Sequence, residues 1–174
     1  KILMFSTPFD FESANFLDEL GVDVFKIASM DLANIPLVEH VAKKMKPVII
    51  STGMSKLYEI DETVEAFKGT GNPNLIILHC NSSYPSSNEE LNLKLIKNYK
   101  KIYPCPIGYS DHSENLLSSI ISLSMGASVI ERHFTLDKNM DGPDHILSST
   151  PTEMQKLVNY SYEIPQILGD GYKK

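Results

Sequence analysis

His112 and His133 each follow a short apolar run that predicts a β-strand, and they are 21 residues apart. This interval is typical of one β-strand/α-helix repeat, so we expect both side chains at matching heights on adjacent parallel strands, about 4.8 Å apart. Two imidazoles placed in this way can bind one metal ion, and Asp111 and Glu131 are acidic neighbours that can orient them. The alternative is a pair of core histidines, each bonded to a backbone carbonyl.

A site with two histidine ligands leaves coordination positions for water and for a substrate. The ion would then act as a Lewis acid on a carbonyl or phosphoryl oxygen. Nitrogen ligands completed by oxygen ligands suit Mn²⁺ or Mg²⁺, and Zn²⁺ is a further alternative.

Lys26 ends another apolar run, where a lysine is costly to bury without an anionic partner. Thr7, Ser51 and Ser110 follow the ends of other predicted strands, and Ser29 follows Lys26 by three residues. All four carry hydroxyl groups. Together with the ammonium group they predict a binding site for a phosphate or carboxylate. The alternative for Lys26 is a surface lysine whose stem lies along apolar groups.

Three further residues are candidates for substrate contacts. Asp31 follows Lys26 by five residues and offers a carboxylate on the same rim, although a helix N-cap or a solvated loop acid is an equal alternative. Asp144 lies in the polar loop after His133 and is a candidate for binding a sugar hydroxyl. Tyr84, before Pro85, could form a wall of the pocket or be part of a plain turn.

The elements that must position these residues alternate along the chain. Six apolar, often β-branched runs predict strands covered on both faces: Ile2–Phe5, Val24–Ile27, Val48–Ile50, Leu75–Leu78, Pro106–Tyr109 and Ser128–Ile130. Amphipathic helical patterns follow them: Phe11–Leu20, Ile35–Lys46, Tyr58–Lys68, Glu89–Lys101, Asn115–Met125 and Thr152–Leu168. Pro165 lies inside the last pattern and predicts a kink or a break there.

Such βα repeats predict an α/β fold with a parallel sheet and right-handed crossovers. An open doubly wound sheet and a closed (β/α)8 TIM-type barrel both have this pattern. Because every predicted strand ends in polar residues, and because no glycine-rich nucleotide motif follows any strand, we favour the barrel. The chain would supply about six βα units, strands 3–8, with the first two missing.

Composition limits the class of protein. The chain has 174 residues and a net charge of -6. Arg132 is its one arginine. Dispersed lysines and a negative charge argue against nucleic acid as a partner. No apolar run approaches the ~20 residues that span a membrane. Cys80 and Cys105 are in no metal-binding pattern, and we expect free thiols in a reducing cytoplasm.

Taken together, the motifs resemble the sialic acid synthase family. The matching stretches run in order over nearly the whole chain: Ser6-Thr7-Pro8-Phe9, Lys26-Ile27-Ala28-Ser29, Pro47–Met54, His79-Cys80, Tyr84-Pro85, Gly108–His112, Glu131–Thr135 and Gly142-Pro143-Asp144. The resemblance implies a transferase that condenses phosphoenolpyruvate with an N-acetylated mannose-type aldose. The products would be a nonulosonic acid and phosphate.

The resemblance also implies roles for individual residues. His112 and His133 match metal ligands, typically for Mn²⁺, and Glu131 matches a carboxylate near the metal. Thr7, Lys26, Ser29, Ser51 and Ser110 match phosphoenolpyruvate-binding positions, while Tyr84 and Asp144 match sugar contacts. Lys26, Asp31 and Glu131 are our candidates for the catalytic residues.

Two departures from the family pattern concern the sugar. Asp31 stands where the family often has Glu, and Ser82 stands where some members that use N-acetylmannosamine have Asn. A legionaminic-type or spore-coat-type product therefore competes with N-acetylneuraminate.

Residues 1–174 would form a partial barrel domain without the small antifreeze-like domain that follows the barrel in the family. We expect a homodimer for the full-length protein and little or no activity from this part alone. Another metal-dependent aldolase or phosphoenolpyruvate-using synthase is one alternative function. An inactive fragment or binding scaffold is the other.

Overall fold

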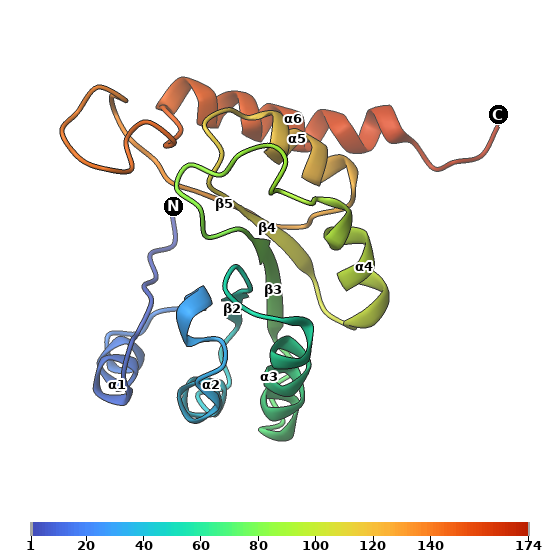
Figure 1. Ribbon diagram of the computed structural model, residues 1–174. Coiled ribbons are helices and arrows are strands. Elements are labelled where there is room, and N and C mark those ends of the chain that lie inside the picture. Colours follow the sequence, from blue (N-terminus) through green and yellow to red (C-terminus); the bar gives the residue numbers. More distant parts are fainter. Residues whose placement is uncertain (1, 174) are drawn as a thin grey trace. The chain divides into compact units, whose positions relative to one another are not determined.

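The computed structural model describes residues 2–173, which form two compact units divided after Leu78 (Figure 1). The first unit contains α1 (Phe11–Glu19), β1 (Phe25–Ile27), the short 3₁₀ helix η1 (Ser29–Asp31), α2 (Ile35–Ala42), β2 (Val48–Ser51) and α3 (Leu57–Gly69). Strand β3 (Leu75–Cys80) crosses the boundary. The second unit contains α4 (Lys94–Ile102), β4 (Ile107–Asp111), α5 (Leu117–Ser124), β5 (Ile130–Arg132) and α6 (Pro151–Leu168).

The strands pair in parallel, as the βα repeats predict. β1 pairs with β2, β2 with β3, and β4 with β5. The strand order in the sheet follows the chain, β1-β2-β3-β4-β5. Sequential order without a reversal is the order of barrel-type sheets, whereas a doubly wound sheet changes direction at its switch point. The α/β class with a parallel sheet is therefore confirmed.

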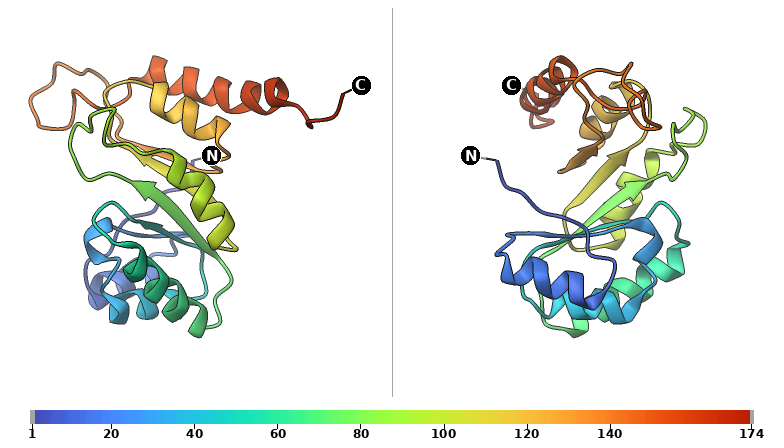
Figure 2. Two further views of the ribbon diagram at one scale, coloured as in Figure 1. Left: turned by 45° about the vertical axis from the view of Figure 1, so that its right-hand side comes forward. Right: turned by 90° about the vertical axis from the view of Figure 1, so that its left-hand side faces the viewer.

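The apolar strands owe their burial to helices. All residues of β1 and β2 are buried, which explains why these strands are mainly apolar rather than alternating, with Lys26 and Ser51 as the polar exceptions. In the first unit, α1, α2 and α3 lie side by side along one face of its strands (Figures 1 and 2). In the second unit, α5 packs against both β4 and α6.

One predicted strand is wrong. Residues 2–5 form no strand, and the side chains of Ile2 and Met4 are 94% and 74% exposed. A strand exists only through hydrogen bonds to a neighbour, and within residues 2–173 this stretch pairs with none. The described part of the chain thus has five strands instead of six.

Of the kink or break predicted at Pro165, the break is wrong, because α6 continues through Pro165 to Leu168. Proline lacks one N–H donor, so one hydrogen bond is lost, to the carbonyl of Ser161 four residues earlier, and this part of α6 is mostly exposed, where water can bond that carbonyl. The Gly169 N–H donates to the Pro165 carbonyl (3.1 Å) and closes the helix. At its start, Thr150 and Glu153 form a reciprocal capping box.

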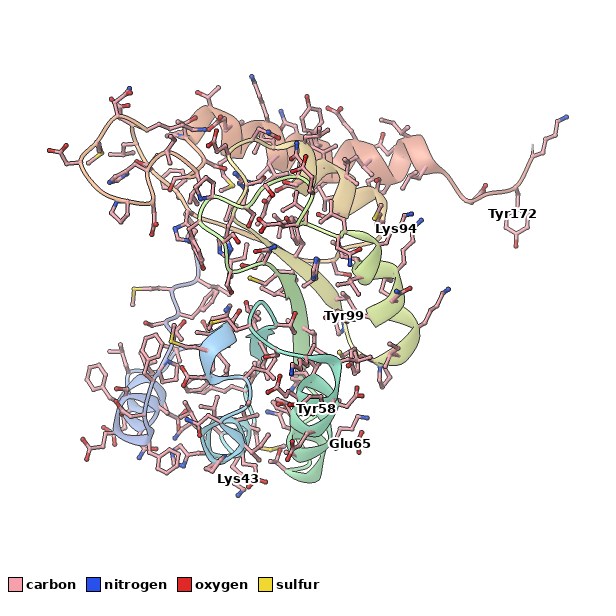
Figure 3. All side chains as sticks on the ribbon, viewed as in Figure 1. Lys43, Tyr58, Glu65, Lys94, Tyr99 and Tyr172 are labelled. Atoms are coloured by element: carbon pink, nitrogen blue, oxygen red, sulfur yellow. The ribbon has the colours of Figure 1, made fainter. Side chains whose placement is uncertain are left out.

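Tyr99 faces inward from α4, and Figure 3 labels it among the side chains. Its ring makes an edge contact with His79 at 6.1 Å between centroids. His79 is buried, and one of its ring nitrogens lies 2.7 Å from the Leu91 carbonyl. Burial lowers the pKa of His79 below its usual value, so the neutral imidazole is the form that packs here.

No helix in the part of the chain that is described has the length and apolarity to cross a membrane.

Asn72 is a polar residue on which the first unit depends. It is buried, and its amide group donates to the carbonyls of Ala42 and Lys46, each at 2.9 Å. Its Oδ1 accepts the N–H of Asn74, also at 2.9 Å. The side chain therefore joins the end of α2 to the loop that leads into β3.

We predict that Asn72→Ala lowers the free energy of unfolding by about 2–3 kcal/mol, because it removes the three hydrogen bonds of a buried amide, to the Ala42 and Lys46 carbonyls and from the Asn74 N–H. Asn88→Ala is the matched control at an exposed position, and we expect a change within about 0.5 kcal/mol. Urea denaturation of the protein that contains this chain measures both. Equal effects of the two substitutions would show that the Asn72 amide contributes nothing specific.

Candidate active site

The ends of β4 and β5 present two sets of polar side chains. Their parallel register aligns Ser110 with Glu131, and Asp111 with Arg132. Because successive residues of a strand point to opposite faces, the first pair lies on one face and the second pair on the other. The Ser110 hydroxyl donates to Glu131 Oε1 at 2.7 Å, and Arg132 donates to Asp111 at 2.5 Å.

The two predicted metal ligands lie together immediately after these strands. The rings of His112 and His133 have centroids 5.3 Å apart and an interplanar angle of 72°. The backbone carbonyl oxygen of Asn81 lies 2.6 Å from His112 Nδ1 and forms a hydrogen bond with it. Since a carbonyl can only accept, Nδ1 carries the proton, and Nε2 of the neutral ring keeps its lone pair. A hydrogen bond to a backbone carbonyl is what we expected of a core histidine. The same kind of bond orients histidines that bind metals, so it is compatible with both alternatives.

Burial favours the neutral form of His112. It lowers the pKa of His112 by more than the bond to the Asn81 carbonyl raises it, and His133 lowers this pKa further, so the imidazole is neutral at neutral pH. His133 is less enclosed, with 33% of its side chain exposed, and its Nδ1 lies 3.6 Å from Asp144 Oδ2. No group of three or more His, Cys, Asp or Glu side chains among residues 2–173 forms a metal site. A cation here would need water or substrate oxygens to complete its coordination.

Tyr84 covers this histidine pair. Its ring stacks on His112 at 4.0 Å between centroids and meets His133 edge-on at 5.7 Å. Burial raises the pKa of Tyr84, and the negative groups Asp144 and Glu131 raise it further. The phenol therefore keeps its proton and offers a hydrogen-bond donor. The predicted wall residue Tyr84 and the predicted sugar contact Asp144 both lie at the histidine pair. Ser82, half-buried in the loop after Asn81, stays a prediction.

The first unit contains four residues of the predicted anion site: Thr7, Lys26, Ser29 and Ser51. Lys26 is buried, and its Nζ donates to Ser51 Oγ at 2.8 Å and to the Ile27 carbonyl at 3.2 Å. The register explains this contact, because Lys26 is opposite Ile49, and Ser51 is two residues further along the same face of β2. Ser29 Oγ accepts the N–H of Gly53 at 2.9 Å, which fixes the loop after β2 beside the end of β1.

Asp31 and Thr7 belong to the same unit. Asp31 is the last residue of η1, and its Oδ2 is a buried side-chain oxygen for which residues 2–173 supply no hydrogen-bond donor. A buried acceptor without a donor is costly, so this oxygen is suited to bind a hydroxyl or N–H of a ligand. Thr7 is half-buried and lines a cavity of about 470 Å³ beside α1.

One expectation about the second unit is wrong: Asp111 does not orient His112. Its carboxylate lies on the opposite face of β4 and forms a buried ion pair with Arg132, both side chains being at most 1% exposed. The carboxylate also accepts the hydroxyls of Ser118 (2.6 Å) and Ser119. Strand alternation could have revealed this pair, because Asp111 and Arg132 each precede a histidine by one residue. The Asn81 carbonyl, which does orient His112, left no signal in the residue types.

Comparison with known proteins identifies the family of the chain. The sequence model of the NeuB family matches residues 1–173. The N,N'-diacetyllegionaminic acid synthase of Campylobacter jejuni is 43% identical over 100% of this chain and 53% of its own length. The human N-acetylneuraminate-9-phosphate synthase is 39% identical over 93% of this chain and 45% of its own length.

A solved structure shows the same fold. The crystal structure of an N-acetylneuraminic acid synthetase from Leptospira borgpetersenii, in complex with citrate, has a TM-score of 0.95 and 42% identity, over 99% of this chain and 60% of that one. The chain belongs to the NeuB family, and the predicted resemblance is confirmed. It spans about half the length of the curated relatives it matches.

We predict that Arg132→Met lowers the free energy of unfolding by about 3–5 kcal/mol, because it leaves the Asp111 carboxylate buried without a counter-charge. Lys68→Met is the control, since it removes the cation of an exposed ion pair with Glu65 and should cost at most about 1 kcal/mol. Guanidinium denaturation followed by circular dichroism compares the two variants. Similar losses would mean that burial adds nothing to the ion pair.

Proposed function

We propose that the protein that contains this chain condenses phosphoenolpyruvate with an N-acetylated mannose-type aldose, yielding a nonulosonic acid and inorganic phosphate. Membership of the NeuB family supports this reaction class, since the relatives named above are synthases of such acids. The observation that carries the proposal is the pair of imidazoles at the ends of β4 and β5, with Nε2 of His112 left to bind a ligand. A complete (β/α)8 barrel, a homodimer and a cytoplasmic location are parts of the same proposal.

His112 and His133 would hold a divalent cation, with Mn²⁺ the first choice and Mg²⁺ the second, because nitrogen ligands and several oxygen ligands suit them. When bound, the ion would supply Lewis acidity toward the aldehyde oxygen of the open-chain sugar. The protein's own contribution is to keep His112 neutral through burial and to fix its orientation through the Asn81 carbonyl.

Lys26 is proposed to bind phosphoenolpyruvate. Its ammonium group lies in a buried region, where a positive charge attracts an anion more strongly than it would in water. Ser51 holds the ammonium in place, and Ser29 holds the loop after β2. Thr7 and Ser110 are proposed as further hydroxyl contacts for this substrate.

The reaction joins C3 of phosphoenolpyruvate to the aldehyde carbon, adds water at C2 and releases phosphate by cleavage of the carbon–oxygen bond. We propose that Asp31 and Glu131 transfer the protons. Asp31 is supported by its unbonded buried oxygen, and Glu131 by its position beside Ser110. Tyr84, Ser82 and Asp144 are proposed as contacts of the sugar, whose exact identity a panel of N-acetylated aldoses would establish.

We predict Mn²⁺-dependent release of phosphate only when phosphoenolpyruvate and the sugar are both present. His112→Ala and His133→Ala should each lower kcat/KM by roughly 100-fold or more, because each removes a ligand of the cation. His40→Ala, on α2, is the control and should leave turnover unchanged. Full metal-dependent activity of His112→Ala would refute the assignment. An aldolase would form a product without releasing phosphate.

We predict that Lys26→Met raises the KM for phosphoenolpyruvate by roughly 100-fold, because removing one member of a buried charge pair costs about 2–5 kcal/mol. The KM for the sugar should change much less. Lys43→Met is the matched control, since Lys43 is an exposed side chain directly after the end of α2 (Figure 3). An unchanged KM for phosphoenolpyruvate in Lys26→Met would contradict the role of Lys26 as the anion-binding group.

A further inference from the structure

Arg132 has more bonds than an ion pair requires. Its Nε donates to Ser149 Oγ at 2.7 Å, and one terminal nitrogen donates to Asp111 Oδ2 at 2.5 Å and to Ser119 Oγ at 3.3 Å. The other terminal nitrogen donates to the carbonyls of Ser113 (2.8 Å) and Leu147 (3.1 Å). The planar guanidinium thus bonds three separate segments: β4 with its following loop, α5, and the segment that precedes α6.

These bonds hold the backbone on both sides of the histidine pair. Asp111 and Ser113 flank His112, and Asp111 Oδ1 also accepts the N–H of Ser113 at 2.9 Å. Arg132 itself precedes His133, and the carbonyl of His133 accepts the N–H of Ser149 at 2.8 Å. Each histidine is therefore fixed by neighbours that bond the same guanidinium or the same carboxylate.

We propose that Arg132 and Asp111 are positioning residues that set the separation of the His112 and His133 imidazoles and so determine the affinity for the divalent cation. The inference rests on the proposed function of the histidine pair. Neither side chain contacts the cation, because strand alternation turns both to the opposite face. They act through the backbone that they share with the two ligands.

The guanidinium shape is essential to this role. A lysine at position 132 would keep the positive charge beside Asp111, but a single ammonium has three donors and no planar fork. It could not donate to Asp111, to Ser149 and to the carbonyls of Ser113 and Leu147 together. A purely electrostatic role of Arg132 would survive this replacement, whereas a positioning role would not.

The test is the dissociation constant for Mn²⁺, measured by the electron paramagnetic resonance signal of the free ion at a temperature where circular dichroism shows every variant to be folded. We expect Arg132→Lys to weaken binding by about 10- to 100-fold, the usual effect of losing a residue that orients a metal ligand. Asn72→Ala, which perturbs a buried hydrogen-bond network in the first unit, should bind Mn²⁺ as the unmodified protein does.

His112→Ala and His133→Ala separate the two proposals. If neither lowers the affinity, the metal site itself is wrong. If both lose Mn²⁺ while Arg132→Lys binds as well as the unmodified protein, the metal site stands and the positioning role is overturned. Should Arg132→Lys not fold, Ser149→Ala removes a single bond to the guanidinium. A several-fold loss of affinity in Ser149→Ala supports the inference, and an unchanged affinity overturns it.

Discussion

The second unit depends on a buried ion pair between neighbouring parallel strands. Removing a carboxylate and a guanidinium from water costs several kcal/mol each, and their attraction offsets this only when the remaining donors and acceptors are also satisfied. Asp111 and Arg132 meet that condition, because three serines, a tyrosine and several backbone groups bond them. Both charges can therefore lie inside the protein, where they join β4, β5 and the segments that follow them.

The same alternation of strand residues places the buried ion pair and the candidate site residues on opposite faces of β4 and β5. Asp111 and Arg132 face one side of their strands, while Ser110 and Glu131 face the other. The next residue of each strand end is a histidine, and the two imidazoles meet 5.3 Å apart. The first unit applies the same rule, because Lys26 and Ser51 share one face of their strands among apolar neighbours. In both units these polar side chains come near the carboxyl ends of parallel strands, where α/β folds place their binding sites.

The sequence alone predicted the parts of this arrangement that depend on periodicity. Five strands and the helices between them follow from apolar runs and amphipathic patterns, and the contacts of Lys26 with Ser51 and of His112 with His133 follow from the strand ends. The stretch 2–5 was mispredicted because an apolar, β-branched run shows only that a strand can form. Whether it does form depends on a partner, which local sequence cannot show. Pro165 likewise stays helical, because it removes a single hydrogen bond on a mostly exposed part of α6.

By itself the sequence determined the residue types, their order and the face that each would take, since these follow from the two-residue repeat of strands. The motifs also identified the NeuB family. Tertiary structure decided which groups meet: that the Asn81 carbonyl and not Asp111 orients His112, that Tyr84 stacks on that ring, and that Arg132 bonds Asp111 and the segment before α6. Such contacts depend on backbone carbonyls and on loops distant in the chain, whose positions no residue pattern records. They exist only once the strands have packed.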